Sequence, residues 1–124
     1  MNGRQNLYRM QFWQLAERQR YLADLEALAA RLRADSDDLT REIDAAGSSE
    51  ASSDMRTAYP IFVGALLERR DKLVGTIAEI DAQIDEAREA VATAQQEVKL
   101  FEGSAAYRGF SFEDRRVRRS RRPV

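Results

Sequence analysis

Residues 59–105 read YPIFVGALLERRDKLVGTIAEIDAQIDEAREAVATAQQEVKLFEGSA and carry the strongest structural signal in the chain. Apolar side chains recur there at alternating steps of four and three residues, and Arg70 is the single exception. A repeat of about 3.5 residues, held over about seven heptads, is typical of the a and d positions of a coiled coil. The stripe consists of Tyr59, Val63, Leu66, Arg70, Leu73, Ile77, Ile80, Ile84, Ala87, Val91, Ala94, Val98, Phe101 and Ala105.

Pro60 stands at the beginning of this stripe and is compatible with a helix there. A proline is tolerated in the first turn because the backbone N–H groups of that turn have no intrahelical partner. Thr57 or Asp54 can serve as the N-cap. The sequence therefore predicts a helix over residues 58–108.

A second stripe runs through the first third of the chain and predicts a helix over residues 4–46. Before Leu22 the register is ambiguous. The residues Tyr8, Phe12, Leu15, Gln19 and Leu22 form one stripe, but its continuation to Leu25 gives two successive three-residue steps, a stammer in the heptad. Gly47 and the polar residues after it predict a loop over 47–57. The main members of this stripe are Tyr8, Leu15, Leu22, Leu25, Ala29, Leu32, Ser36, Leu39, Ile43 and Ala46.

A loop of about ten residues reverses the chain but cannot carry it back along a helix of more than 40 residues at about 1.5 Å per residue. The predicted fold is therefore all-α, a long antiparallel two-helix coiled-coil hairpin over residues 1–108. If the loop is centred near residue 52, Leu32 lies near Leu73 and Tyr8 lies near residues 96–98. Residues 109–124 lose the heptad, and we expect a disordered, flexible basic tail there.

The composition excludes several classes of chemistry. The 124 residues include no histidine and no cysteine, which excludes Ser-His-Asp and Cys-His nucleophiles, Cys/His zinc sites and disulfides. The chain has neither a phosphate-binding loop nor a run of about 20 apolar residues. The first residues do not resemble a signal peptide. We expect a cytoplasmic protein that is not an enzyme and has no metal or cofactor.

The C-terminal segment is strongly basic although the net charge of the chain is −1. Such a segment can bind nucleic acid, an anionic membrane surface or an acidic protein groove, but no base-reading motif accompanies it, which argues against nucleic acid. The candidate residues of this basic tail are Arg115, Arg116, Arg118, Arg119, Arg121 and Arg122.

Three large apolar residues fall outside the two stripes. Phe62 and Leu67 flank the second stripe, and they either widen the core beside the loop or form an exposed patch for a partner. Trp13 lies off the first stripe, which favours either contact with a partner or packing against Phe110 or Phe112.

Two stretches resemble a known family. RQNLYRMQFWQLAERQRYLADLEALAARL (residues 4–32) and AYPIFVGALLERRDKLVGTIAEIDAQIDEAREAV (residues 58–91) look like the short alphaproteobacterial branch of the flagellar export protein FliJ family. The most distinctive part is the AYPxF start of the second helix, followed by Arg69 and Arg70. Generic coiled coils share heptads but rarely this start.

The resemblance implies a stalk-like component of the flagellar type III export apparatus that acts at the cytoplasmic face of the inner membrane. Its implied partners are the export ATPase, the export gate membrane protein and export chaperones. We expect the chain itself to be a monomer. The alternative is a generic coiled-coil scaffold or tether whose basic tail binds nucleic acid or an anionic membrane. Carried over by position, the ATPase-facing residues are Arg4, Arg9, Arg18, Arg20, Gln96 and Lys99, and the gate-facing residues are Tyr59, Phe62 and Leu66.

Overall fold

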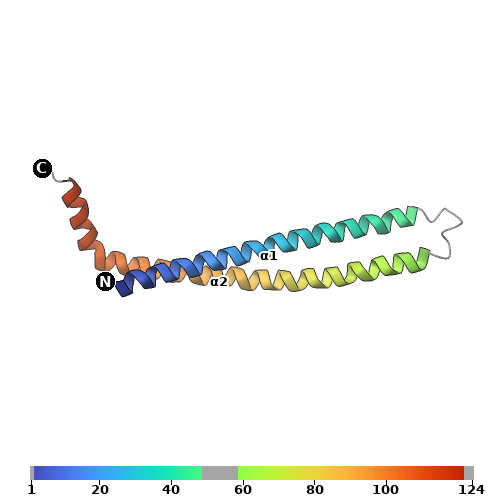
Figure 1. The fold of residues 1–124 in the computed structure, drawn as a ribbon, viewed down its shortest axis with the longest axis horizontal. Helices are drawn as coiled ribbons and strands as arrows, with labels where there is room; N and C mark the ends of the chain where they lie inside the picture. Colours follow the sequence, from blue (N-terminus) through green and yellow to red (C-terminus); the bar gives the residue numbers. More distant parts are fainter. Residues whose placement is uncertain (1, 49–58, 122–124) are drawn as a thin grey trace. The chain divides into compact units, whose positions relative to one another are not determined.

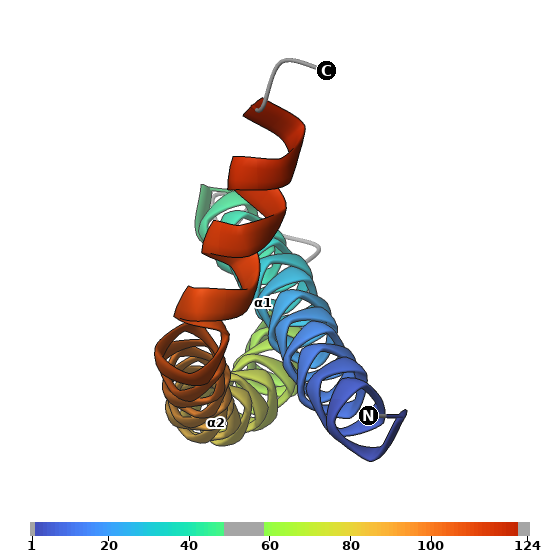
Figure 2. The same cartoon turned by 90° about the vertical axis from the view of Figure 1, so that its left-hand side faces the viewer.

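The computed structural model describes the backbone of residues 2–48 and 59–121 and the side chains of residues 3–48 and 60–103. The described backbone consists of helix α1, Asn2–Ser48, and helix α2, Tyr59–Arg121. Each helix is an unbroken ribbon in Figure 1 and Figure 2. Over these residues the all-α prediction is confirmed, and the two helices pack against each other.

The first helix continues past the predicted end at residue 46. Gly47 does not end α1, and no glycine among the described residues has a positive φ. The hydroxyl of Ser48 donates a hydrogen bond of 3.2 Å to the carbonyl of Asp44, which satisfies one of the last carbonyls of the helix. Most of the predicted loop, residues 49–57, lies outside the described residues.

The second helix begins at Tyr59, so Pro60 lies in its first turn as the sequence predicts. The helix ends at Arg121, whereas the sequence predicts an end at residue 108. Gly103 and Gly109 each weaken a helix by about 1 kcal/mol without forbidding it, and proline next occurs at residue 123. The side chains of the predicted tail lie outside the described ones, so its flexibility stays a prediction.

The chain divides into two compact units. The central unit is Tyr21–Ala87, and the terminal unit combines Met1–Arg20 with Arg88–Val124. Each unit contains one segment of α1 and one segment of α2, so each has its own helix pairing.

The core of the central unit is a small cluster of aliphatic side chains. Leu25 and Ala29 of α1 pack with Ile84 and Ala87 of α2, and Ala29 is completely buried. Leu22 and Ile80 pack against the edge of this cluster. At the side of the helix pair, Nη2 of Arg33 lies 2.6 and 2.7 Å from the two carboxylate oxygens of Asp81. The core therefore lies in a narrow stripe between two helix segments that run alongside each other (Figure 1).

In the terminal unit, the buried side chains come from α2. Val91, Ala94 and Val98 are buried, and Phe101 is half-buried. Most of the half-buried residues of α1 in the same unit have polar side chains. They are Tyr8, Gln11, Gln14, Leu15, Glu17 and Arg18.

Burial along α2 follows the predicted heptad. Every described member of the stripe, from Val63 to Phe101, is buried or half-buried, including Arg70. Most residues between them are exposed. The periodicity therefore predicted correctly which face of α2 packs.

On α1 the predicted stammer is wrong. Phe12 and Gln19 are exposed, while Gln11 and Arg18 are half-buried and continue the heptad without interruption from Tyr8 into the Leu22 stripe. The stammer arose because hydrophobicity favoured Phe12 over Gln11. An arginine can occupy such a position because its aliphatic stem covers apolar surface while the guanidinium finds an acceptor.

The predicted pairing of residues between the two helices is also wrong. Tyr8 contacts Phe101 and Glu102 of α2, beyond the predicted residues 96–98. Arg33 pairs with Asp81, although its neighbour Leu32 was predicted near Leu73. The prediction took residue 52 as the centre of the turn, whereas α1 ends at Ser48 and α2 begins at Tyr59, so the assumed centre lay too early in the chain.

The core cluster makes a prediction for stability. Ile84→Ala should lower the free energy of unfolding by about 2–4 kcal/mol, because it removes buried methyl groups beside Ala29 and leaves a cavity. Val74→Ala, at a half-exposed position of α2 in the same unit, should cost less than about 1 kcal/mol. Urea unfolding followed by circular dichroism measures both. Equal losses for the two variants would show that Ile84 is not a core residue.

Candidate partner-binding surfaces

An aromatic cluster joins α1 to α2 in the terminal unit. The ring of Tyr8 lies 5.0 Å from that of Phe12 and 5.2 Å from that of Phe101, measured between centroids. The guanidinium of Arg4 lies 5.9 Å from the centroid of Phe101, within the range of a cation–π contact. The cluster gives the exposed Phe12 a partner on its own helix, and it connects the first turns of α1 to α2.

The hydroxyl of Tyr8 donates a hydrogen bond of 2.9 Å to Oε1 of Glu102. This hydrogen bond raises the pKa of Tyr8 above its usual value of 10.0, and desolvation and the negative charge of Glu102 act in the same direction. Because the raised pKa favours the neutral phenol, the contact contributes below pH 10 and is lost as the pH rises through the raised pKa. Sequence reasoning missed Glu102, since its register placed Tyr8 beside residues 96–98, at least four residues earlier on α2.

The residues predicted to face the ATPase fall into two groups. Arg9 and Arg20 of α1 are exposed, and Arg20 forms an ion pair of 3.2 Å with Glu17. Gln96 and Lys99 are exposed on α2. These four residues are accessible to a partner.

The other two arginines of that set contact α2. Arg4 lies over Phe101, as described above. Nη1 of Arg18 donates a hydrogen bond of 3.4 Å to the carbonyl oxygen of Ala90, and the side chain is half-buried between the helices. Arg18 therefore has a packing role in this unit that the sequence did not predict.

The three residues predicted to face the gate differ in exposure. The side chain of Phe62 is 50% exposed, and the neighbouring Ile61 is more exposed still. Leu66 is only 4% exposed and packs in the stripe. The side chain of Tyr59 lies outside the described ones, as do the side chains of the six arginines of the basic tail.

The central unit also has a shallow groove with walls of opposite charge. Asp35, Asp38 and Glu42 of α1 line one side, and Arg69 and Lys72 of α2 line the other. Leu39, Leu73 and Thr76 complete the lining. Asp38 also forms an ion pair with Arg41 on the next turn. Exposed ion pairs of this kind contribute little to stability, so the groove is a polar edge of the helix pair.

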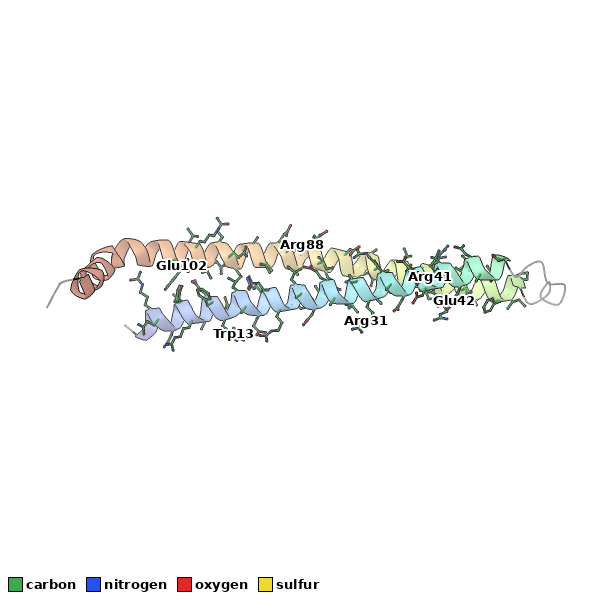
Figure 3. All side chains as sticks on the ribbon, turned by 90° about the horizontal axis from the view of Figure 1, so that it is seen from above. Trp13, Arg31, Arg41, Glu42, Arg88 and Glu102 are labelled. Atoms are coloured by element: carbon green, nitrogen blue, oxygen red, sulfur yellow. The ribbon has the colours of Figure 1, made fainter. Side chains whose placement is uncertain are left out.

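Three large apolar side chains are exposed on one face of α1 in the terminal unit. Leu7, Met10 and Trp13 follow one another at steps of three residues, which places them side by side on the helix surface. Figure 3 shows Trp13 on the side of α1 that faces away from α2. The spacing of the three residues was readable from the sequence, but only the position of the packed stripe shows that they point outward.

No family model, no curated protein and no solved structure matches this chain. No helix of the described residues is long and apolar enough to cross a membrane. Among the same residues, acidic side chains form no group that could hold a metal ion.

The Tyr8–Glu102 contact generates a titration experiment. Glu102→Ala removes the hydrogen bond and the nearby negative charge, so the pKa of Tyr8 should fall towards the usual tyrosine value. Glu97→Ala, on the same helix, should leave it unchanged. Nuclear magnetic resonance of ring-labelled tyrosine, with Tyr8→Phe to assign the signal, measures the pKa in each variant. An unchanged pKa in Glu102→Ala would show that the contact does not form in solution.

Proposed function

We propose that this chain is a non-enzymatic, stalk-like component of the flagellar type III protein export apparatus, similar to the FliJ family. In this role it couples the export ATPase ring to the export gate and assists export chaperones. It acts as a monomer on the cytoplasmic face of the inner membrane, at the base of the flagellum. ATP hydrolysis belongs to the partner.

The observation that carries this proposal is the uninterrupted heptad on both helices. On α1 it runs from Tyr8 to Ala46, and on α2 its described members run from Val63 to Phe101. Long paired helices resist bending, and a stalk needs length and stiffness but no chemistry of its own. The Tyr59-Pro60 start of α2 adds the feature that distinguishes the FliJ-like sequence from a generic coiled coil.

We further propose that the helices form an antiparallel coiled coil. The interhelical contacts of each unit support this arrangement. In the terminal unit Tyr8 contacts Phe101 while Arg18, further along α1, contacts Ala90, earlier along α2. In the central unit the partner of Arg33 is Asp81, whereas Glu42 shares a groove with Arg69. In both units the partner number falls on α2 as the number rises on α1.

The exposed residues of the terminal unit are the best candidates for ATPase contact. Arg9 and Arg20 of α1, with Gln96 and Lys99 of α2, are accessible without any change in helix packing. Arg4 is also exposed, although it lies over Phe101, whereas the half-buried Arg18 can reach a partner only by giving up its hydrogen bond to Ala90. At the gate-facing end, Phe62 is accessible, whereas contact through Leu66 requires the helices to separate.

A pull-down with the purified export ATPase of the same organism tests the proposal. The double variant Arg9→Glu/Arg20→Glu should reduce capture about tenfold or more, because each change replaces an attraction with a repulsion at an interface. Helicity should not change, since exposed charges contribute little to folding.

The matched control is Arg31→Glu/Arg41→Glu, which reverses two exposed arginines of α1 in the central unit. The control should bind the ATPase as the unchanged chain does. No capture of the ATPase by the unchanged chain would refute the proposed function, and equal binding by both double variants would remove Arg9 and Arg20 from the interface.

A further inference from the structure

Leu7, Met10 and Trp13 form an exposed apolar patch on α1, outside the residues that are buried or half-buried in the described part of the chain. The three side chains are 47%, 54% and 63% exposed. They occupy two successive turns of the helix in the terminal unit, and Trp13 is the only tryptophan of the chain. Large apolar side chains clustered outside a core mark an interaction surface.

Positively charged residues border this exposed apolar patch. Arg9 precedes Trp13 by one turn, and Arg20 follows it by two turns, so both lie near Trp13 on the helix surface. Both are exposed. Glu17 is the single acidic residue of α1 up to Arg20, and its ion pair with Arg20 offsets its charge. The surface therefore favours an anionic partner.

The size of the surface decides between a protein and a lipid partner. A stable protein–protein interface covers about 800 Å² on each side. Three half-exposed side chains on a convex helix offer far less. Reversible attachment to a bilayer needs only a few apolar side chains that enter the interface, together with basic residues that contribute about 1 kcal/mol each near anionic lipid.

We infer that the exposed apolar patch is an attachment site for a bilayer of anionic lipids. Trp13 lies at the level of the headgroups, where tryptophan side chains prefer to reside, and Leu7 and Met10 enter the acyl boundary beside it. Arg9 and Arg20 bind lipid phosphates through their guanidinium groups. The inference shares Arg9 and Arg20 with the ATPase contact of the proposed function, but it requires no export ATPase and is argued from the exposed residues alone.

Fluorescence of Trp13 tests the inference in the full chain. Vesicles of phosphatidylcholine with about a third phosphatidylglycerol should shift the emission to shorter wavelength, and brominated lipid should quench it. Vesicles of phosphatidylcholine alone should have a much smaller effect. Binding to anionic vesicles with no change in Trp13 emission would overturn the inference, since attachment would then run through another basic segment such as residues 115–122.

Sedimentation with the same vesicles tests the individual residues. Met10→Ala and Trp13→Ala should each weaken partition by about five- to tenfold, and Arg9→Gln and Arg20→Gln by about fivefold. The matched controls are Leu100→Ala of α2 and Arg31→Gln of α1, exposed apolar and basic positions without an assigned binding role, which should partition as the unchanged chain does. Equal losses in the variants and the controls, or a Trp13 shift caused by the export ATPase but not by vesicles, would overturn it.

Discussion

Burial of one narrow stripe of side chains between α1 and α2 is the constraint on which the other features depend. In each unit only every third or fourth residue of a helix lies on the packed face, so little apolar area is available per residue. This explains why Ala29, Ala87 and Ala94 are among the most buried residues, and why most side chains between stripe positions remain exposed.

The stripe on α2 and the helical fold class were predictable because periodicity reports directly on the packed face. The stripe at the beginning of α1 was not predictable from hydrophobicity, because Phe12 is more hydrophobic than Gln11. Choosing Phe12 leads to Gln19 in place of Arg18 and requires a stammer. The register was not predictable either. It was derived from an assumed turn at residue 52, and the contacts that define the actual pairing, such as the hydrogen bond from Tyr8 to Glu102, involve polar groups that the apolar pattern does not report.

The candidate partner-binding residues were likewise only partly predictable from the sequence. Sequence reasoning proposed Arg9, Arg20, Gln96 and Lys99 by resemblance, and these residues are exposed. It did not distinguish them from Arg18, which packs between the helices. The exposed face of Leu7 and Met10 was missed because an exposed apolar residue is recognised only after the packed stripe has been located.

The pairing of the two helices is tested most directly by distances between spin labels, and the absence of native cysteine makes labelling simple. Labels at positions 33 and 81, and at 42 and 69, should each be separated by less than about 20 Å, the width of two packed helices with their side chains. Labels at 33 and 71 should be further apart, because ten residues of helix add about 15 Å along the axis. A 33–71 distance shorter than the 33–81 distance would contradict the register, and a short 33–81 distance with a long 42–69 distance would contradict the antiparallel arrangement.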